Sequence, residues 1–416
     1  MKPFYSLIVS LTSILINFCS IFNSKAKGFL DGRKNTHKII RDFKLKGTNS
    51  LGLSVIWFHC ASLGEFEQSR PLIEKVKKFL PEYKIAISFF SSSGYNVKKN
   101  YELADWTGFL PMDKKKEINF LINFLNPKIL ILVKNEFWPN LLYCMKEKKI
   151  PIISISCNFR SKKFFFSPWA VWFLKAIKTI NHFYTSDIET KKILKKKNIN
   201  NTTMVGDTRI DRVLNILNKK KEFKIINDFI NNEDCWIAGS TWKEDYSLFT
   251  DYIHSKKSPK VIIAPHDCSA ESISAITKKL NIPYSLWSSY SFKGDHSKKV
   301  LIIDTIGVLK YTYKYAKWAY IGGGMGGNGL HNILEAAVYD IPIIIGKNFF
   351  DFPEATDLIK YGTCFSVSSD IEFEKVTQLI SNDIKRKPIN NYDFIKKQEG
   401  ATDEIFSGLK KILVEA

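Results

Sequence analysis

One stretch sets the fold class: residues 55–89 read VIWFHCASLGEFEQSRPLIEKVKKFLPEYKIAISF. Two β-rich apolar runs, Val55–Cys60 and Tyr83–Phe89, flank a helical pattern that extends to Leu80. Apolar runs of this length are typical of buried strands, and a helix between two of them predicts a βαβ unit with parallel strands. The stretch therefore indicates an α/β fold.

The same alternation continues on both sides of a polar segment near residues 212–232, which we interpret as an inter-domain segment. Before it, further strands are predicted at Trp106–Leu110, Ile129–Val133, Pro151–Ser156 and His182–Thr185. After it, strands are predicted at Cys235–Ala238, Val261–Ala264, Val300–Ile303, Trp318–Ile321 and Pro342–Ile345. The rhythm predicts two Rossmann-like, doubly wound domains facing a cleft, at residues 36–215 and 216–416. The sequence leaves open whether a last helix near Asp403–Val414 packs back on the first domain.

Composition limits the class of protein. The chain has 416 residues, 45% of them hydrophobic, which excludes a disordered chain. Lys and Arg total 62 and Asp and Glu total 41, so the net charge is +21. This charge is explained either by compositional drift towards lysine or by attraction to phosphate on a nucleic acid, a membrane or a substrate.

The seven cysteines form no CxxC pair and no zinc-like cluster with histidine, so we expect reduced thiols and no metal site.

The amino terminus carries an uncharged segment, Phe4–Phe22, which is long enough as a helix to approach the thickness of a membrane core. Three interpretations stay open: a cleaved signal peptide, an uncleaved anchor that spans or lies in the membrane, and a buried or interfacial amphipathic helix. We expect residues 1–35 to form a membrane anchor or an interfacial helix. Positive residues after the segment favour a cytoplasmic body.

A glycine-rich loop follows the strand predicted at Trp318–Ile321: residues 322–329 read GGGMGGNG. His331, Asn332 and Glu335 are then predicted to open a helix, with His331 and Glu335 on one face. A strand, a glycine loop and a helix N-terminus together favour a phosphate or nucleotide site, because bare backbone amides can approach an anion. A dehydrogenase motif and a purely structural turn remain as alternatives, and the late position in the chain argues against the first.

Two acidic residues follow predicted strands of the first domain. Glu65 comes shortly after Val55–Cys60, and Glu136 follows Ile129–Val133. A carboxylate at the carboxyl end of a sheet can act as a general base on a hydroxyl group. It can equally be a helix-capping acid that complements the helix dipole, and spacing alone favours that interpretation.

Several ordered segments resemble the bacterial transferases of 3-deoxy-D-manno-octulosonic acid (Kdo). Residues 59–65, HCASLGE, match the pattern H-x-A-S-x-G-E, and residues 136–140, EFWPN, match E-x-W-P-N. Residues 304–307, DTIG, match D-T-x-G. The glycine loop with HNILE at 331–335 resembles G-G-S…G-G-H-N-x-L-E, and FDFPE at 350–354 resembles F-N-F-x-E with Asp for Asn. The matches keep one order over residues 57–355.

The resemblance implies a GT-B glycosyltransferase that moves Kdo from CMP-Kdo to the phosphorylated lipid A precursor (lipid IVA) in lipopolysaccharide biosynthesis. It implies an inverting reaction without metal or other cofactor, at the cytoplasmic side of the inner membrane, in contact with its lipids and without nucleic acid. Glu65 is then the general base, and Glu136 is a second acidic residue of the catalytic site, on the acceptor side. The CMP-sugar is bound by Ser240, Thr241, His266, Gly323, Gly324, Asn332 and Glu335, and the acceptor by Ser62, Gly64 and Arg160.

The chain departs from this family at two places. The family often shows P-R-H-P where residues 265–268 read PHDC, so an arginine is missing; His266 could replace it as a cation or as a neutral donor. The family often shows E-T-E-x-W-P where Lys134 stands in place of the first acid. Two other functions remain open: a GT-B transferase of a UDP- or GDP-sugar, and a non-enzymatic binder of phosphate or nucleic acid.

Overall fold

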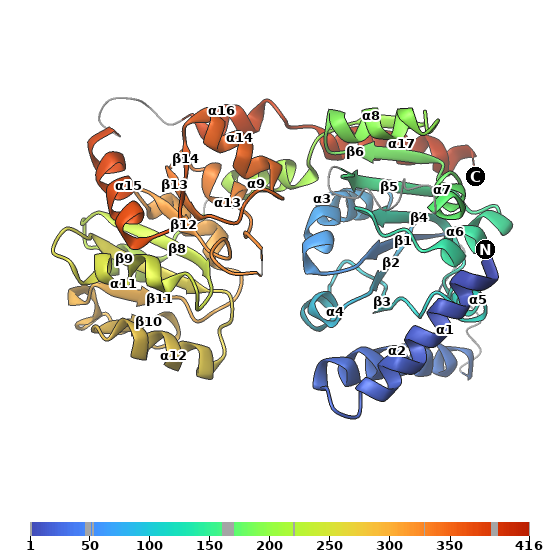
Figure 1. The fold of residues 1–416 in the computed structure, drawn as a ribbon, viewed down its shortest axis with the longest axis horizontal. Helices are drawn as coiled ribbons and strands as arrows, with labels where there is room; N and C mark the ends of the chain where they lie inside the picture. Colours follow the sequence, from blue (N-terminus) through green and yellow to red (C-terminus); the bar gives the residue numbers. More distant parts are fainter. Residues whose placement is uncertain are drawn as a thin grey trace. The chain divides into compact units, whose positions relative to one another are not determined.

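The computed structural model describes residues 2–45, 51, 54–159, 170–218, 221–327, 329–383 and 390–415. The chain divides into two compact units, Met1–Arg212 with Glu399–Ala416, and Val213–Gln398. In each unit, helices cover a seven-stranded parallel sheet (Figure 1). Both units are Rossmann-like α/β structures, which confirms the predicted α/β class with two such domains.

The first sheet has the strand order β3-β2-β1-β4-β5-β6-β7. Strand β1 lies between β2 and β4, and all six of its residues are buried. The strand order reverses between β1 and β4, and ligands of open α/β sheets bind outside the carboxyl ends of strands at such a point. The strands are β1 (Val55–Cys60), β2 (Lys84–Phe89), β3 (Trp106–Phe109), β4 (Pro127–Val133), β5 (Ile152–Cys157), β6 (His182–Thr185) and β7 (Thr202–Met204).

The last helix of the chain packs in the first unit. Ile405, Phe406 and Leu409 enter the same apolar cluster as Val76 of α3. Asp211 accepts hydrogen bonds from the amides of Gly400 and Thr402 and so holds the start of α17. The helices are α1 (Lys2–Cys19), α2 (Ser24–Leu45), α3 (Leu63–Phe79), α4 (Ser92–Lys98), α5 (Lys115–Leu125), α6 (Pro139–Glu147), α7 (Val171–Ile177), α8 (Ile188–Lys196), α9 (Thr208–Asn218), which continues into the second unit, and α17 (Ala401–Glu415).

The second sheet has the order β10-β11-β9-β8-β12-β13-β14, which reverses between β8 and β12. Its strands are β8 (Cys235–Thr241), β9 (Lys260–Pro265), β10 (Tyr284–Leu286), β11 (Val300–Ile302), β12 (Ala319–Ile321), β13 (Ile343–Gly346) and β14 (Cys364–Val367). Its helices are α10 (Lys224–Ile230), α11 (Tyr246–His254), α12 (Ala270–Leu280), η3 (Trp287–Ser289), η4 (Asp295–Ser297), η5 (Leu309–Tyr311), η6 (Tyr313–Tyr315), α13 (Leu334–Ala337), α14 (Pro353–Tyr361), α15 (Asp370–Asp383) and α16 (Asn391–Lys396).

Every predicted strand exists, with ends that differ by no more than three residues. Strands β7, β10 and β14 were not predicted, because runs of three or four residues show no periodicity that separates them from a loop. Since β10 was missed, the strand before the glycine loop is the fifth of the second unit and not the fourth. The unit boundary after Arg212 lies three residues before the expected one, and residues 399–416 belong to the first unit.

The amino-terminal segment forms α1, which exposes a stripe of apolar side chains. Leu7, Leu11, Ile14, Leu15 and Phe18 are each more than half exposed. Figure 1 shows α1 beside α2 in the first unit. Among the residues that the structure describes, none of the helices combines the length and the apolar character needed to cross a membrane.

Helix α1 is attached to the body of the first unit by polar and aromatic contacts. The Tyr5 hydroxyl donates a 2.8 Å hydrogen bond to the buried carboxylate of Asp113. Asp113 also accepts the backbone amides of Asn140 and Leu141 at the start of α6. The ring of Tyr5 lies 5.2 Å from that of Trp172. Asp113 therefore links α1 to the segment EFWPN at 136–140.

Candidate active site

The acidic residues predicted in the first unit lie at the switch point of its sheet. Ser62 is the N-cap of α3 directly after β1, and Glu65 stands in the first turn of that helix. Lys134 and Glu136 follow the neighbouring strand β4. The sheet order therefore brings the two loops together at the place where α/β folds bind their ligands.

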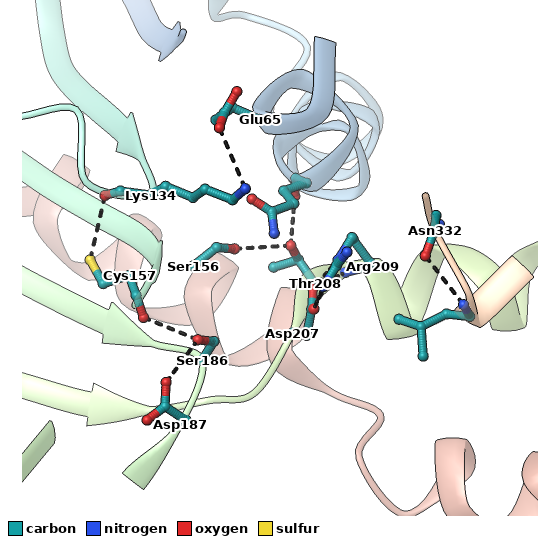
Figure 2. Close-up of polar contacts among 12 residues, drawn as sticks. Glu65, Lys134, Ser156, Cys157, Ser186, Asp187, Asp207, Thr208, Arg209 and Asn332 are labelled. Atoms are coloured by element: carbon teal, nitrogen blue, oxygen red, sulfur yellow. Dashed lines mark hydrogen bonds and ion pairs between the residues drawn. The ribbon is translucent and has the colours of Figure 1, made fainter. Parts of the chain in front are cut away.

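Glu65 is a mostly buried carboxylate held from two sides. The Ser62 hydroxyl donates a hydrogen bond to its Oε2, and the Lys134 ammonium lies 3.4 Å from its Oε1 (Figure 2). Its side chain is only 14% exposed. Burial favours the protonated acid, but the charge of Lys134 and the hydrogen bond from Ser62 outweigh burial and lower the pKa of Glu65. The carboxylate is thus ionised at neutral pH, as a general base must be.

His59 and Glu136 lie beside each other at the same edge. His59 is fully buried, and its Nδ1 contacts the hydroxyl of Ser88 at 2.9 Å and the carbonyl of Ser88 at 3.2 Å. Burial lowers the pKa of His59 to about 4, so the imidazole is neutral. Its Nε2 lies 4.0 Å from Oε2 of Glu136, which also accepts a 3.2 Å hydrogen bond from the Trp138 indole. The carboxylate of Glu136 thus lies between His59 of β1 and Trp138, which follows β4.

The three residues predicted to bind the acceptor differ in what the structure shows of them. Ser62 contacts Glu65 directly. A Cβ on Gly64 would meet the Ser62 hydroxyl oxygen at 3.7 Å, an ordinary contact, so space does not require glycine there. Arg160 lies outside the described residues.

Sequence reasoning missed a polar group that follows β7. The guanidinium of Arg209 donates from Nε to both carboxylate oxygens of Asp207, at 3.1 and 2.9 Å. Thr208 donates to the backbone carbonyl of Gln68 in α3, and its hydroxyl lies 3.1 Å from that of Ser156 (Figure 2). Burial opposes ionisation of Asp207, but Arg209 and Lys134 lower its pKa. The sequence signal that could have revealed this group is the short polar run Asp207–Arg209, but strand β7 before it was not predicted.

The predicted donor residues lie at the switch point of the second sheet, between β8 and β12. Ser240 and Thr241 end β8, and the backbone of Ser240 is left-handed, with φ +53°. His266 follows β9, and its amide donates to the carbonyl of Thr241. Gly322, Gly323 and Gly324 follow β12. These residues thus share one edge of one sheet.

Asp245, which the sequence did not single out, ties these loops together. Its Oδ2 accepts the amide of Trp242 at 2.8 Å and the amide of Gly323 at 3.0 Å. Its Oδ1 accepts the Tyr320 hydroxyl at 2.7 Å. The side chain is fully buried, and burial raises its pKa. Asp245 therefore links the loop after β8 to the amide of Gly323 at the start of the glycine loop.

Two histidines and a tryptophan stack at this edge. The ring of Trp242 lies 4.4 Å from His266, and His266 lies 4.6 Å from His331. The Trp242 indole donates a 2.9 Å hydrogen bond to Nε2 of His331, so Nε2 is unprotonated. Burial lowers the pKa of His331 to about 4 and also lowers the pKa of His266. Of the two roles predicted for His266, the neutral donor is therefore favoured at neutral pH.

The glycine loop is packed backbone against backbone. Gly323 has φ +91°, and a Cβ there would collide with the carbonyl of Gly329. A Cβ on Gly324 would lie 2.9 Å from the amide of Gly346 after β13. A structural role, which the sequence left open, thus accounts for these two glycines even without a ligand.

The helix predicted after the loop is much shorter than expected. Helix α13 has four residues, Leu334–Ala337, so His331 and Asn332 lie in the preceding loop. The prediction that His331 and Glu335 share a helix face is wrong, because the helix begins only at Leu334, three residues after His331. The Asn332 side chain accepts the amide of Leu334 at 3.3 Å (Figure 2) and begins the helix. Glu335 is in the first turn of α13.

Within the described part of the chain, no group of three or more His, Cys, Asp or Glu side chains could hold a metal ion. All seven cysteines are free thiols, and five of them are buried.

Comparison with known proteins identifies relatives of this chain. The family model of the 3-deoxy-D-manno-octulosonic-acid transferases (kdotransferases) matches residues 32–212. A bifunctional glycosyltransferase/methyltransferase of Fusobacterium nucleatum is 29% identical over 79% of this chain, which spans about half (53%) of that protein. The 3-deoxy-D-manno-octulosonic acid transferases of Haemophilus influenzae and Aquifex aeolicus are 24% and 25% identical over 86% and 78% of this chain, and the matches cover 87% and 86% of those proteins.

Solved structures share the fold. Staphylococcus aureus MnaA, solved with UDP, has a TM-score of 0.61 at 12% identity, over 86% of this chain and 97% of its own. The UDP-GlcNAc 2-epimerase of Neisseria meningitidis has a TM-score of 0.59 at 16% identity, over 87% of this chain and 100% of its own.

Proposed function

We propose that this chain, a glycosyltransferase of the Kdo transferase family, transfers Kdo from CMP-Kdo to a phosphorylated lipid A precursor. The observation that carries the proposal is the ionised, oriented carboxylate of Glu65 at the switch point of a unit that matches the family model over residues 32–212. Membership in an enzyme family removes the non-enzymatic alternative.

In the proposed reaction, Glu65 accepts the proton of a sugar hydroxyl of the acceptor. That oxygen forms a bond to the anomeric carbon of Kdo while the bond from this carbon to the CMP oxygen breaks, and CMP leaves with the electron pair. Attack from the face opposite CMP inverts the anomeric centre. General-base assistance of this kind contributes roughly 10²–10⁴ in rate. Glu136 is the second acidic group on the acceptor side.

The second unit supplies the donor site in this proposal. The amide of Gly324 and the side chains at the ends of β8 and β9 can donate hydrogen bonds to the CMP phosphate and sugar. The amides of Gly322 and Gly323 already donate to the carbonyl of Gly239 and to Asp245, and they hold the loop in shape. Since Asp245 fixes the amides of Trp242 and Gly323, the loop is arranged before the donor arrives. We assign the ribose contact to Glu335.

The function is tested by incubating the detergent-supported protein with the lipid A precursor and either CMP-Kdo, a UDP-sugar or a GDP-sugar. We expect a Kdo-bearing lipid product, detected by mass spectrometry, from CMP-Kdo alone. Transfer from a UDP- or GDP-sugar, with none from CMP-Kdo, would overturn the proposed donor and keep the enzyme class.

We also propose that the protein binds the cytoplasmic face of the inner membrane through α1 lying in the interface. The exposed apolar stripe of α1 adjoins a groove of about 580 Å³ lined by side chains of both helices. Four basic residues of α2 line it, Arg33, Lys34, Lys38 and Arg41, together with His37 and the acids Asp42 and Glu117. An apolar stripe beside a basic groove is suited to an anionic lipid surface.

This association predicts the effect of removing the stripe. We expect Leu11, Leu15 and Phe18, all replaced by serine, to lower binding to anionic phospholipid vesicles by at least about tenfold, because each buried apolar side chain contributes roughly 1.5–3 kcal/mol. Vesicle co-sedimentation measures the binding. The matched control is Ile371→Ser, which removes a similarly exposed apolar side chain from α15. Equal binding by the triple variant and the control would contradict the assignment.

A further inference from the structure

Lys134 stands where the strand β4 ends, in a conformation that a lysine rarely adopts. Its φ is +60°, in the left-handed region where glycine is the residue without steric cost. Its amide donates to the carbonyl of Ile155, and its carbonyl accepts the hydroxyl of Ser154 at 3.0 Å. Neighbouring strand β5 therefore holds the peptide groups on both sides of this residue, and strained backbone of this kind is concentrated at functional sites.

The held backbone directs the lysine side chain to the catalytic carboxylate. Figure 2 shows the ammonium of Lys134 reaching Glu65, where it lies 3.4 Å from Oε1. The other oxygen of Glu65 accepts the Ser62 hydroxyl. The carboxylate is thus held on both oxygens, and its own backbone amide also stabilises the ionised form.

We propose that Lys134 is a positioning residue for Glu65: its ammonium fixes the orientation of the carboxylate and keeps it ionised for proton transfer in mildly acidic conditions. This inference rests on the proposed role of Glu65 as general base. It assigns a role to the residue at which the chain departs from its family's pattern, which has an acid there. An acid at this distance would repel Glu65, whereas the lysine attracts it.

The other titratable groups that the structure describes near Glu65 supply no second positive charge that could replace that of Lys134. His59 and Cys60 of β1 both sense the Glu65 charge, but burial keeps the first neutral, with a pKa of about 4, and raises the pKa of the second far above neutral. Asp207 is paired with Arg209, which lowers its pKa together with Lys134. Glu136 faces His59 at 4.0 Å. Lys134 is therefore the cation that offsets the burial of Glu65, and its charge counters the rise in pKa that burial alone would cause.

The first experiment measures the pKa of the Glu65 carboxyl without any substrate. Protein labelled with ¹³C at the glutamate carboxyls is titrated by NMR, and the Glu65→Gln spectrum assigns the signal. We expect Lys134→Met to raise the pKa of Glu65 and Lys134→Arg to leave it low. The control Lys77→Met breaks a comparable ion pair, with Asp105 at 3.2 Å, and leaves the pKa unchanged. An unchanged pKa in Lys134→Met overturns the proposal whether or not the protein transfers Kdo.

The second experiment measures kcat/KM for Kdo transfer between pH 5 and pH 8. A raised pKa leaves less ionised base at low pH, so the deficit of Lys134→Met against wild type is at least about threefold larger at pH 5 than at pH 8. Lys134→Arg restores the wild-type profile. A deficit that is equal at every pH means that the lysine acts only on structure and overturns the proposal, while an inactive wild type refutes the proposed function alone.

Discussion

We expect Glu65→Gln to lower kcat for transfer from CMP-Kdo by at least about 100-fold, the largest effect of any single substitution in the first unit. Glutamine keeps the shape of the side chain and can still accept a hydrogen bond from Ser62. It cannot accept the proton of the acceptor hydroxyl, and it also loses the ion pair with Lys134. The measurement is single-turnover transfer with saturating donor and acceptor, because product release then does not hide the chemical step.

The matched control is Glu74→Gln, which neutralises an acid on the same helix, α3, where its partner is Arg70 at 2.8 Å. We expect this variant to retain wild-type kcat. Equal rates for wild type and Glu65→Gln would remove Glu65 from the role of base and leave the enzyme class intact. A rise in KM for the acceptor with unchanged kcat would instead make Glu65 a binding residue.

The second large effect concerns the glycine loop. We expect Gly323→Ala to destabilise the second unit by about 2 kcal/mol or more, because alanine must adopt φ +91° and its methyl group collides with the carbonyl of Gly329. For a unit of this size that corresponds to about 4–8 °C in Tm. The displaced amide also loses its hydrogen bond to Asp245, so we expect the KM for CMP-Kdo to rise by at least about tenfold.

Gly327→Ala tests whether glycine content alone matters in this loop. A Cβ on Gly327 meets no atom within 4 Å, and its φ lies outside the left-handed region, so we expect wild-type Tm and KM. Differential scanning calorimetry and donor titration separate the effects on stability and on binding. If Gly323→Ala matched Gly327→Ala in both measurements, the packed loop would have no part in donor binding.

The strands that carry both sites could be predicted because they are buried on both faces. All six residues of Val55–Cys60 and all three of Ala319–Ile321 are buried, so the sequence shows continuous apolar runs without any alternation. Strand β7 could not be predicted in this way, since its three residues are partly exposed at the sheet edge. Helix α13 was predicted from the glycine loop that precedes it, and such a loop does not determine where a helix begins or ends. The helix has only four residues, and the left-handed residue Asp340 lies shortly after its end.

The position of Glu65 was predictable because it depends on local order: a strand, a short loop and a helix start. Its partner Lys134 was visible in the sequence only as a departure from a family pattern. Asp245 was not visible at all, although it holds the amide of Gly323, 78 residues further along the chain. The order of strands in the sheet, which no local pattern encodes, decides which loops meet.

The sequence by itself therefore determined the α/β class, the two Rossmann-like domains and the loops that carry the acid and the glycines. These depend on the hydrophobic period and on residues close together in the chain. The tertiary structure alone decided that Lys134 holds Glu65, that Asp245 fixes the glycine loop and that the last helix packs in the first unit. Each of these is a contact between distant residues, and its free energy is gained only when the sheet has brought its strands into one order.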